Sequence, residues 1–363
     1  MKITIQKSVI ENILIHAQPF LEKKDTSQIT SHLLIDVSDS KLTVKATDYE
    51  IGLQIYTDNI NIIETGTVTA NGKKLLDIIR ILKDGNINLE TKNDTLYISQ
   101  SNSNFKLPTF SYKEFPIFPT YEGKPQISIN SHLLIESLKK VTPSIDSNNP
   151  KFELNGALID IKSSGINFAS TDTRRLAVVN IENQNNNELS IIIPKKAIIE
   201  IQKLFFDNIE LYYDETSLII HSNQYTFFTK LINGKFPEYS RIIPKEVSKT
   251  LMLPKAEMIE SLKQITTIST DVKITFLNNS IVFESLSDDN IEAKTEMNYE
   301  TGFSSPFVIA INTRYLLDFL NSINNSEFSI GLNESNLPFV LSENNFKTVV
   351  MPIVIYTLIN KDC

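Results

Sequence analysis

A long internal repeat is the feature of this chain that most constrains its fold. Residues 134–142 (LIESLKKVT) and 258–266 (MIESLKQIT) keep the same residue types position by position at a spacing of 124 residues, and a weaker copy starts at Val9. A period of about 120 residues is the size of a small domain rather than of a solenoid unit. In a chain of 363 residues, this repeat predicts three similar domains.

Further markers recur in the same order and at nearly the same spacing, which makes chance similarity a poor explanation. Phe115-Pro116 is repeated at Phe236-Pro237, and the pair Thr47-Asp48 is repeated at Thr171-Asp172 with a loose echo at Ser287-Asp288. An acid recurs within a second helical pattern at Asp77, Glu200 and Asp318. Strand-like triplets recur at 96–98, 218–220 and 339–341. Each is followed by a segment with a central aromatic residue, namely Asn104-Phe105-Lys106, Gln224-Tyr225-Thr226 and Asn345-Phe346-Lys347.

Each repeat predicts a strand, a helix, several strands, a second helix and further strands. Alternating apolar residues indicate the opening strands at 2–6, 126–129 and 250–253. Start signals for the first helices are Ser8, Asn130-Ser131 and Pro254, and the second helices are expected within 70–83, 193–204 and 311–323. Strands joined mostly by short hairpins favour antiparallel sheets, so the fold class is α+β, with two helices and antiparallel sheet in each domain.

Bulk composition narrows the class of protein. No apolar run reaches the 18 or more residues that a transmembrane helix needs, and the amino terminus alternates like a strand instead of resembling a signal peptide. One cysteine, Cys363, excludes a disulfide framework and favours a reducing cytoplasm. The net charge of −8 argues against a simple DNA-gripping domain unless positive charge is gathered on one surface.

Positive charge does gather on the repeated second helices. Residues 70–83 carry a net charge of +3 and residues 193–204 a net charge of +2, whereas residues 311–323 are neutral. Lysines also solvate the outer face of ordinary amphipathic helices, which is the alternative explanation. Recurrence at matching positions favours a surface that attracts a polyanion without reading its sequence.

Residue patterns for catalysis or for metal binding are not evident. Ten scattered glycines form no phosphate-binding loop, and no Ser/His/Asp arrangement is indicated by spacing. The histidines at 16, 32, 132 and 221 lack metal-ligand spacing, and Asp288-Asp289 is better explained as a solvated turn than as a metal site. We therefore expect no cofactor, no metal and no enzymatic activity.

Several segments resemble one family, the bacterial sliding clamps that form the beta subunit of DNA polymerase III. The resemblance covers residues 1–355 and rests on segments that occur in one order on the threefold repeat: 154–158 (LNGAL), 171–177 (TDTRRLA), 233–239 (NGKFPEY), 243–245 (IPK) and 349–352 (VVMP). It implies three domains of the DNA clamp fold at 1–120, 126–244 and 245–355, followed by an extension at 356–363.

Membership of this family would imply a head-to-tail homodimer that forms a closed ring around duplex DNA and tethers the replicative polymerase. Partners would be duplex DNA, a second copy, the catalytic subunit of DNA polymerase III, the clamp loader and repair proteins, in the cytoplasm and with no membrane. Positions matching the family's dimer interface are Lys73, Phe105, Leu107 and roughly Ile268. Positions matching its DNA-proximal residues are Lys24, Lys73, Phe152 and Lys196.

The resemblance also implies an apolar pocket that takes short peptides from partner proteins. Its residues here would be Leu154, Thr171, Thr173, Arg174, Arg175, Leu176, Pro237, Arg241, Ile242, Asn312, Tyr315, Val349, Met351, Pro352 and Ile353. Aliphatic residues would form the floor, with arginine and tyrosine at the rim. The chain departs from the family at Thr173-Arg174, where Gly-His is frequent. Ordinary core packing is the alternative for most of these residues.

Two other classes of function remain open on sequence grounds. One is a repeat-built scaffold for protein interactions that never encircles DNA. The other is an enzyme whose catalytic site is assembled between domains. A stable monomer would favour either of them over the ring, because one such chain cannot close around a duplex.

Overall fold

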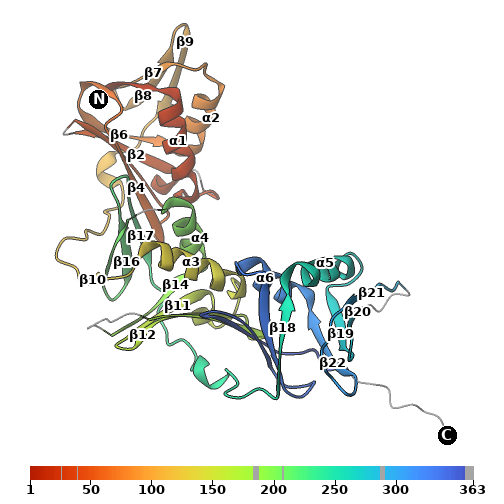
Figure 1. The fold of residues 1–363 in the computed structure, drawn as a ribbon. Helices are drawn as coiled ribbons and strands as arrows, with labels where there is room; N and C mark the ends of the chain where they lie inside the picture. Colours follow the sequence, from red (N-terminus) through yellow and green to blue (C-terminus); the bar gives the residue numbers. More distant parts are fainter. Residues whose placement is uncertain (26, 39, 183–187, 207, 287–290, 356–363) are drawn as a thin grey trace. The chain divides into compact units, whose positions relative to one another are not determined.

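The computed structural model describes residues 1–25, 27–38, 40–182, 188–206, 208–286 and 291–355 (Figure 1). The residues Ser287, Asp288 and Asp289, discussed above, and the extension at 356–363 lie outside this set. The chain divides into two compact units. Unit 1 comprises residues 1–132 and 196–231, and unit 2 comprises residues 133–195 and 232–363.

The described residues contain six α-helices, two for each repeat. Their bounds are α1 Lys7–Ala17, α2 Gly72–Ile81, α3 Ser131–Val141, α4 Lys195–Leu204, α5 Lys255–Thr266 and α6 Thr313–Ser322. The second helices α2, α4 and α6 each begin two residues inside the predicted ranges. Asn71 and Asn312 cap α2 and α6, because their side chains accept hydrogen bonds from the backbone N–H groups of Lys74 and Arg314.

The start signals of the first helices are only partly correct. Helix α3 begins at Ser131, and Pro254 is the capping residue of α5. Ser8 does not precede α1 but lies inside its first turn, and the capping residue Gln6 makes no side-chain hydrogen bond there. The strand β1 runs directly into this helix, which leaves no separate capping position for a serine.

Unit 1 holds two antiparallel sheets. The five-stranded sheet has the order β5-β1-β7-β8-β9, and the eight-stranded sheet has the order β10-β15-β16-β17-β4-β3-β2-β6. The first comprises β1 Lys2–Gln6, β5 Asn61–Glu64, β7 Asn86–Lys92, β8 Thr95–Gln100 and β9 Ser103–Pro108. The second comprises β2 His32–Ser38, β3 Lys41–Thr47, β4 Ile51–Thr57, β6 Gly66–Asn71, β10 Gln126–Ile127, β15 Glu210–Tyr213, β16 Ser217–His221 and β17 Tyr225–Lys230.

Unit 2 also holds two antiparallel sheets. The eight-stranded sheet has the order β14-β11-β12-β13-β25-β24-β23-β18, and the four-stranded sheet has the order β21-β20-β19-β22. The first comprises β11 Gly156–Lys162, β12 Gly165–Thr171, β13 Arg175–Ile181, β14 Leu189–Pro194, β18 Lys249–Pro254, β23 Glu327–Leu332, β24 Phe339–Glu343 and β25 Phe346–Val350. The second comprises β19 Asp271–Phe276, β20 Ser280–Leu286, β21 Lys294–Asn298 and β22 Phe307–Asn312. The predicted α+β class with antiparallel sheets is confirmed.

Each eight-stranded sheet joins strands from two successive repeats. In unit 1 strand β17 pairs with β4, with Tyr225 opposite Ile55. In unit 2 strand β25 pairs with β13, with Phe346 opposite Val179. Ile55 and Val179 are 124 residues apart, so both joints use the same register on the same strands of the repeat. We call the β17–β4 pairing the first joint and the β25–β13 pairing the second joint.

The hairpins correct one alignment predicted from the sequence. The strands β9, β17 and β25 begin at Ser103, Tyr225 and Phe346, so these three residues are equivalent in the fold. The sequence had aligned Phe105 with Tyr225 and Phe346, which is wrong by two residues. The aromatic residue shifts along the strand between repeats, whereas the hydrogen-bonded hairpin keeps its length.

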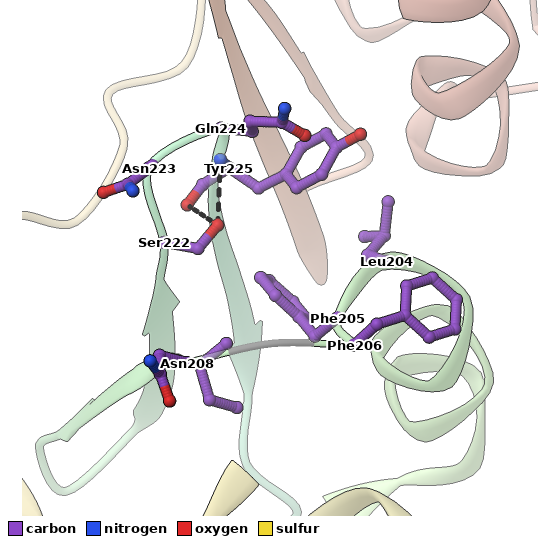
Figure 2. A pocket seen from close by; sticks show the side chains of 9 residues that line it. Leu204, Phe205, Phe206, Asn208, Ser222, Asn223, Gln224 and Tyr225 are labelled. Carbon is purple, nitrogen blue, oxygen red and sulfur yellow. Dashed lines mark hydrogen bonds between the residues drawn. The ribbon is translucent and has the colours of Figure 1, made fainter. Parts of the chain in front are cut away.

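A buried aromatic core lies behind each joint. In unit 1 the ring of Phe227 packs edge-on against Phe20 and Phe205, with ring centroids 5.9 and 6.4 Å apart. Phe205 also faces Tyr225, and Figure 2 shows both rings at a small pocket beside the end of α4. In unit 2 Phe319 stacks on Phe346 at 5.1 Å. These cores fix the second helix of one repeat against the strands of its own repeat.

Candidate functional site

An apolar cluster in unit 2 contains three of the predicted pocket residues. Leu154, Leu176 and Val349 are each only 2% exposed and belong to one buried cluster with other aliphatic side chains. They come from a short helix at Phe152–Leu154, from β13 and from β25, so the second joint brings them together. Phe236 belongs to the same cluster, and Tyr239 packs against it from the segment that follows β17.

Arg175 lies at the centre of a buried polar network beside this cluster. Its Nε donates to Asp172 Oδ2 at 2.9 Å, its Nη1 donates to Asp318 Oδ2 at 2.8 Å, and its Nη2 donates to the carbonyl of Pro143. The guanidinium also lies 4.6 Å from the ring centroid of Tyr315. Arg175 is 5% exposed, so it is not the exposed rim residue that the sequence suggested.

Burial shapes the ionisation of Tyr315. Desolvation raises the pKa of its phenol, and the charge of Asp172 adds to this effect. The charges of Arg175 and Arg174 lower the pKa and partly offset the rise. The phenol is therefore a neutral hydrogen-bonding group at physiological pH.

A tight turn sets the position of the neighbouring residues. Thr171 Oγ1 donates to the carbonyl of Arg175 at 2.6 Å and accepts from the N–H of Thr173 at 3.1 Å. Thr173 has a φ of 74°, a left-handed conformation that a β-branched residue rarely adopts. The first joint has the same turn, with Thr47 in the place of Thr171 and Tyr49 at a φ of 72°.

The carboxyl-terminal segment runs along this turn. The N–H of Met351 donates to the carbonyl of Arg174 at 2.9 Å, and the N–H of Ile353 donates to the carbonyl of Ala310 at 2.7 Å. Met351 and Ile353 are 39% and 37% exposed. This segment therefore presents apolar side chains to solvent beside the buried cluster.

Most of the remaining predicted pocket residues are exposed or half-buried in unit 2. Pro237, Arg174, Arg241 and Ile242 are exposed, and Pro352 is half-buried. The side chain of Asn312 caps α6 and donates to Asp271 at 2.9 Å, so its polar groups already have partners. Sequence reasoning missed Asp172 and Asp318 as partners of Arg175, although the recurrence of an acid at position 318 was a usable signal.

The residues predicted to lie near DNA are mostly exposed. Lys24 and Lys73 are exposed, and Phe152 is 72% exposed on its short helix. Lys196 makes an ion pair with Asp48 across the first joint and is half-exposed. Lys24, Lys73 and Lys196 belong to unit 1 and Phe152 to unit 2.

Of the residues predicted for a dimer interface, two lie on an edge strand and two lie on or after a helix. Phe105 and Leu107 are on β9, the edge strand of the five-stranded sheet, with Leu107 buried and Phe105 half-buried. Ile268 follows α5 and is 39% exposed. Lys73 lies in the first turn of α2.

Neither a metal centre nor a membrane span is found in the part of the chain that the structure describes. No group of three or more His, Cys, Asp or Glu side chains there could hold a metal ion. None of the helices among these residues is both long and apolar enough to cross a bilayer. The pocket in Figure 2 has amide and hydroxyl groups, such as those of Asn223 and Ser222, and no charged side chain among its described lining residues.

Comparison with known proteins shows which family this chain resembles. Three family models match in sequence: the N-terminal domain of the DNA polymerase III beta subunit at residues 1–119, its central domain at 128–238 and its C-terminal domain at 240–354. A beta sliding clamp of Helicobacter pylori is 38% identical, covering 98% of this chain and 100% of the relative. One from Vibrio cholerae is 26% identical over 97% of this chain and 100% of the relative.

Solved structures agree with this assignment. The H. pylori beta clamp bound to a DNA ligase peptide superposes with a TM-score of 0.93 at 39% identity, covering 98% of this chain and 100% of that one. The beta subunit from Pseudomonas aeruginosa, at 23% identity and a TM-score of 0.90 over 98% and 100% of the two chains, shows the same fold. The chain therefore belongs to the DNA polymerase III beta subunit family, the DNA sliding clamps of bacterial replication.

Proposed function

We propose that two copies of this chain close head to tail into a ring around duplex DNA, and that the ring tethers the replicative polymerase in the cytoplasm without being an enzyme itself. Each chain would contribute domains at 1–120, 126–244 and 245–355, and the family models matched at closely similar ranges support these boundaries. The extension at 356–363 lies outside the described residues.

The single observation that carries the ring is that two strands equivalent to joint-forming strands, β9 and β21, each end a sheet among the described residues. Strand β9 is the equivalent of β17 and β25, which form the joints, and it ends the five-stranded sheet. Strand β21 is the equivalent of their partners β4 and β13, and it ends the four-stranded sheet. An unpaired edge strand is a template for pairing with another chain. A third joint between β9 of one chain and β21 of the next would use both edges.

The repeat also gives the register of this third joint. Ladder positions in the β3–β4, β12–β13 and β20–β21 hairpins make Ile55, Val179 and Thr295 equivalent. Because Tyr225 faces Ile55 and Phe346 faces Val179, Ser103 of one chain would face Thr295 of the other. Two chains close into a ring when one heterologous contact, here the third joint, is used twice.

The side chains along this register suit one another. Lys106 would face Glu292 and Leu107 would face Ile291, an isoleucine that is 58% exposed in the single chain. Opposite charges and apolar pairs across antiparallel strands are the combinations that stabilise a sheet. Phe105 would face the small Ala293, which leaves room for its ring.

Helix positions support Lys73 as a member of the same interface. Lys73 on α2 is equivalent to Lys196 on α4, because both occupy the second position after the preceding strand. Lys196 reaches across the first joint to Asp48. Lys73 would reach across the third joint in the same way, with Ile268 covering the neighbouring apolar surface.

We assign DNA contact to the exposed cations of the repeated helices and to Phe152. A protein with a net charge of −8 that carries Lys73 and Lys196 on equivalent helices and Lys24 outside them attracts the phosphate backbone only weakly and without sequence preference. Weak contact suits a sliding ring, because topological trapping replaces affinity.

We assign partner binding to the cluster of Leu154, Leu176 and Val349 with the exposed Met351 and Ile353 at its edge. Buried aliphatic floors with a few polar groups are the usual form of ligand pockets. The H. pylori beta clamp has been solved with a DNA ligase peptide, which supports a peptide ligand of this kind. The catalytic subunit of DNA polymerase III, the clamp loader and repair proteins would compete for this site.

Cysteine crosslinking tests the third joint. Asn104→Cys with Lys294→Cys, in a Cys363→Ser background, should give a covalent dimer on mild oxidation, because facing residues lie about 4.5 to 5.5 Å apart at Cα. The matched control, Asn104→Cys with Glu296→Cys, is displaced by two residues and should crosslink poorly. A monomer in both variants would favour a scaffold that does not encircle DNA, and equal crosslinking would reject this register.

A further inference from the structure

The first joint carries an apolar cluster at the place equivalent to the partner cluster of the second joint. Phe115, Phe118, Ile219 and Phe228 form it, and their equivalents are Phe236, Tyr239, Val340 and Val349. The correspondence holds at one spacing of 121 residues for all four. The repeat has therefore built the same pocket scaffold twice on the chain.

The two clusters differ in the space at their floor. Gly52 occupies the position of Leu176, and a Cβ at Gly52 would lie 2.2 Å from the ring of Phe228. Phe228 occupies the position of Val349, so an aromatic ring takes the volume that the leucine fills in unit 2. The first cluster is thus a well-packed site with aromatic walls and not a collapsed copy.

A groove follows the first cluster along the segment after β9. Its lining includes Leu34, Tyr56, Tyr121 and the aromatic residues Phe115 and Phe118. Ile117, in the same lining, is 97% exposed.

The floor of this groove is polar where that of unit 2 is aliphatic. Lys45 and Gln54 replace Ala169 and Val178, and both line the groove. The ammonium of Lys45 lies 5.7 Å from the ring centroid of Phe118. Among the described residues no carboxylate lies within ion-pair distance of this ammonium, although the exposed Glu122 is part of the groove lining.

The Lys45 ammonium is partly buried, so a nearby carboxylate would stabilise its charged form. Desolvation lowers the pKa of Lys45, and the charge of Asp36 offsets only part of this effect. Asp36 itself accepts hydrogen bonds from Thr67 and Ser38. A carboxylate brought into the groove would restore favourable electrostatics to a partly desolvated cation.

We propose that this first-joint groove is a second docking site, and that it takes a peptide segment in which an acidic residue is flanked by aromatic side chains. The carboxylate would accept hydrogen bonds from Lys45 Nζ and Gln54 Nε2, and the flanking rings would pack on Phe118 and Tyr121. The proposal rests on the geometry of unit 1 and does not require the cluster in unit 2 to bind a peptide.

Fluorine NMR on the full-length chain tests this site without altering the groove floor. The reporters are Ile117→Cys and, separately, Ile242→Cys, each in a Cys363→Ser background and carrying a trifluoromethyl group. The probes are acetyl-Phe-Asp-Phe-amide and its neutral counterpart acetyl-Phe-Asn-Phe-amide. The aspartate peptide should shift the signal at position 117 in a saturable way, with an affinity about tenfold above that of the asparagine peptide.

Two lysine variants test whether Lys45 is the cation that binds the aspartate of the peptide. Lys45→Met should reduce the affinity for the aspartate peptide about tenfold and leave the asparagine peptide unchanged. The matched control is Lys230→Met, which removes an equal charge from the same sheet and should change neither peptide.

Three results would overturn the proposal. They are equal affinity of the two peptides at position 117, a response at position 242 alone, and a signal at position 117 that changes with protein concentration without peptide. The last would assign the groove to a second copy of the chain. The asparagine comparison uses the unmodified floor, so it decides the matter even if Lys45→Met fails to fold.

Discussion

Arg175 donates from Nη1 to Asp318 Oδ2 at 2.8 Å and so connects β13 in one repeat with α6 in the next. The two residues are 143 positions apart, and the arginine side chain is 4% exposed. The contact therefore belongs to the structure of the second joint and lies beside the apolar cluster that contains Leu176 and Val349. A variant at Arg175 changes both at once.

Removing this arginine should destabilise unit 2. Arg175→Ala leaves the carboxylates of Asp172 and Asp318 without their buried partner, which should lower the free energy of unfolding by about 3 kcal/mol. The matched control is Arg174→Ala, whose exposed side chain should change stability by less than about 0.5 kcal/mol. Urea unfolding of both variants measures this, and equal stability would show that the network contributes nothing.

Met351 offers a cleaner test of peptide binding. Met351→Ala removes an exposed apolar side chain beside the partner cluster, so it should weaken a DNA ligase peptide about tenfold while leaving the unfolding temperature and the dimer unchanged. Isothermal titration with the peptide measures the affinity. Unchanged affinity would remove Met351 from the site, and loss of the dimer would indicate a structural role instead.

The turn at Thr173 stores backbone strain. A β-branched residue at a φ of 74° costs about 1 to 2 kcal/mol relative to glycine, part of which glycine returns through its greater freedom in the unfolded chain. Thr173→Gly should therefore stabilise the protein by about 0.5 to 1 kcal/mol. Tyr49→Gly alters the equivalent turn of the first joint and serves as a comparison. A lower melting temperature for Thr173→Gly would contradict the strain.

Stability should fall in mild acid because of His32. Desolvation lowers the pKa of this buried histidine from 6.5 to about 4. Between these values the unfolded chain binds a proton that the folded chain does not, so stability decreases as the pH falls through this window. The effect should be at most about 3 kcal/mol at the acid end.

Comparing unfolding in urea at pH 7 and at pH 5 measures the contribution of His32. His32→Gln should flatten the pH dependence, whereas His132→Gln, at an exposed histidine, should retain it. An identical pH profile for the chain with and without His32 would show that other groups cause the loss.

The repeat predicted much of the fold because it is a local pattern seen three times. Apolar periodicity located the helices to within a few residues, and hairpin signals indicated antiparallel sheets. The pairing of β17 with β4 and of β25 with β13 was beyond this reasoning, because hydrogen bonds between strands so distant along the chain leave no trace in local periodicity. The shift of Phe105 against Tyr225 has the same origin, since only the ladder fixes the register.

The candidate site residues also differ in whether local sequence could predict their surroundings. Leu154, Leu176 and Val349 meet in one buried cluster, and their assignment to a partner pocket stays a prediction. The burial of Arg175 was not foreseen, because its partners Asp172 and Asp318 lie on separate elements that only the second joint brings together. The first-joint groove was missed as well, since Lys45 and Gln54 carry no motif and acquire meaning only beside their equivalents Ala169 and Val178.

The most direct test of the ring is the fate of clamps on circular and on linear DNA. The Asn104→Cys, Lys294→Cys dimer would be loaded onto nicked circular DNA by a clamp loader, oxidised to lock both copies of the third joint, and washed at high salt. The account predicts that the locked dimer stays on the circle and is lost once a restriction enzyme linearises it. Equal retention on both forms, or equal loss from both, would contradict topological binding.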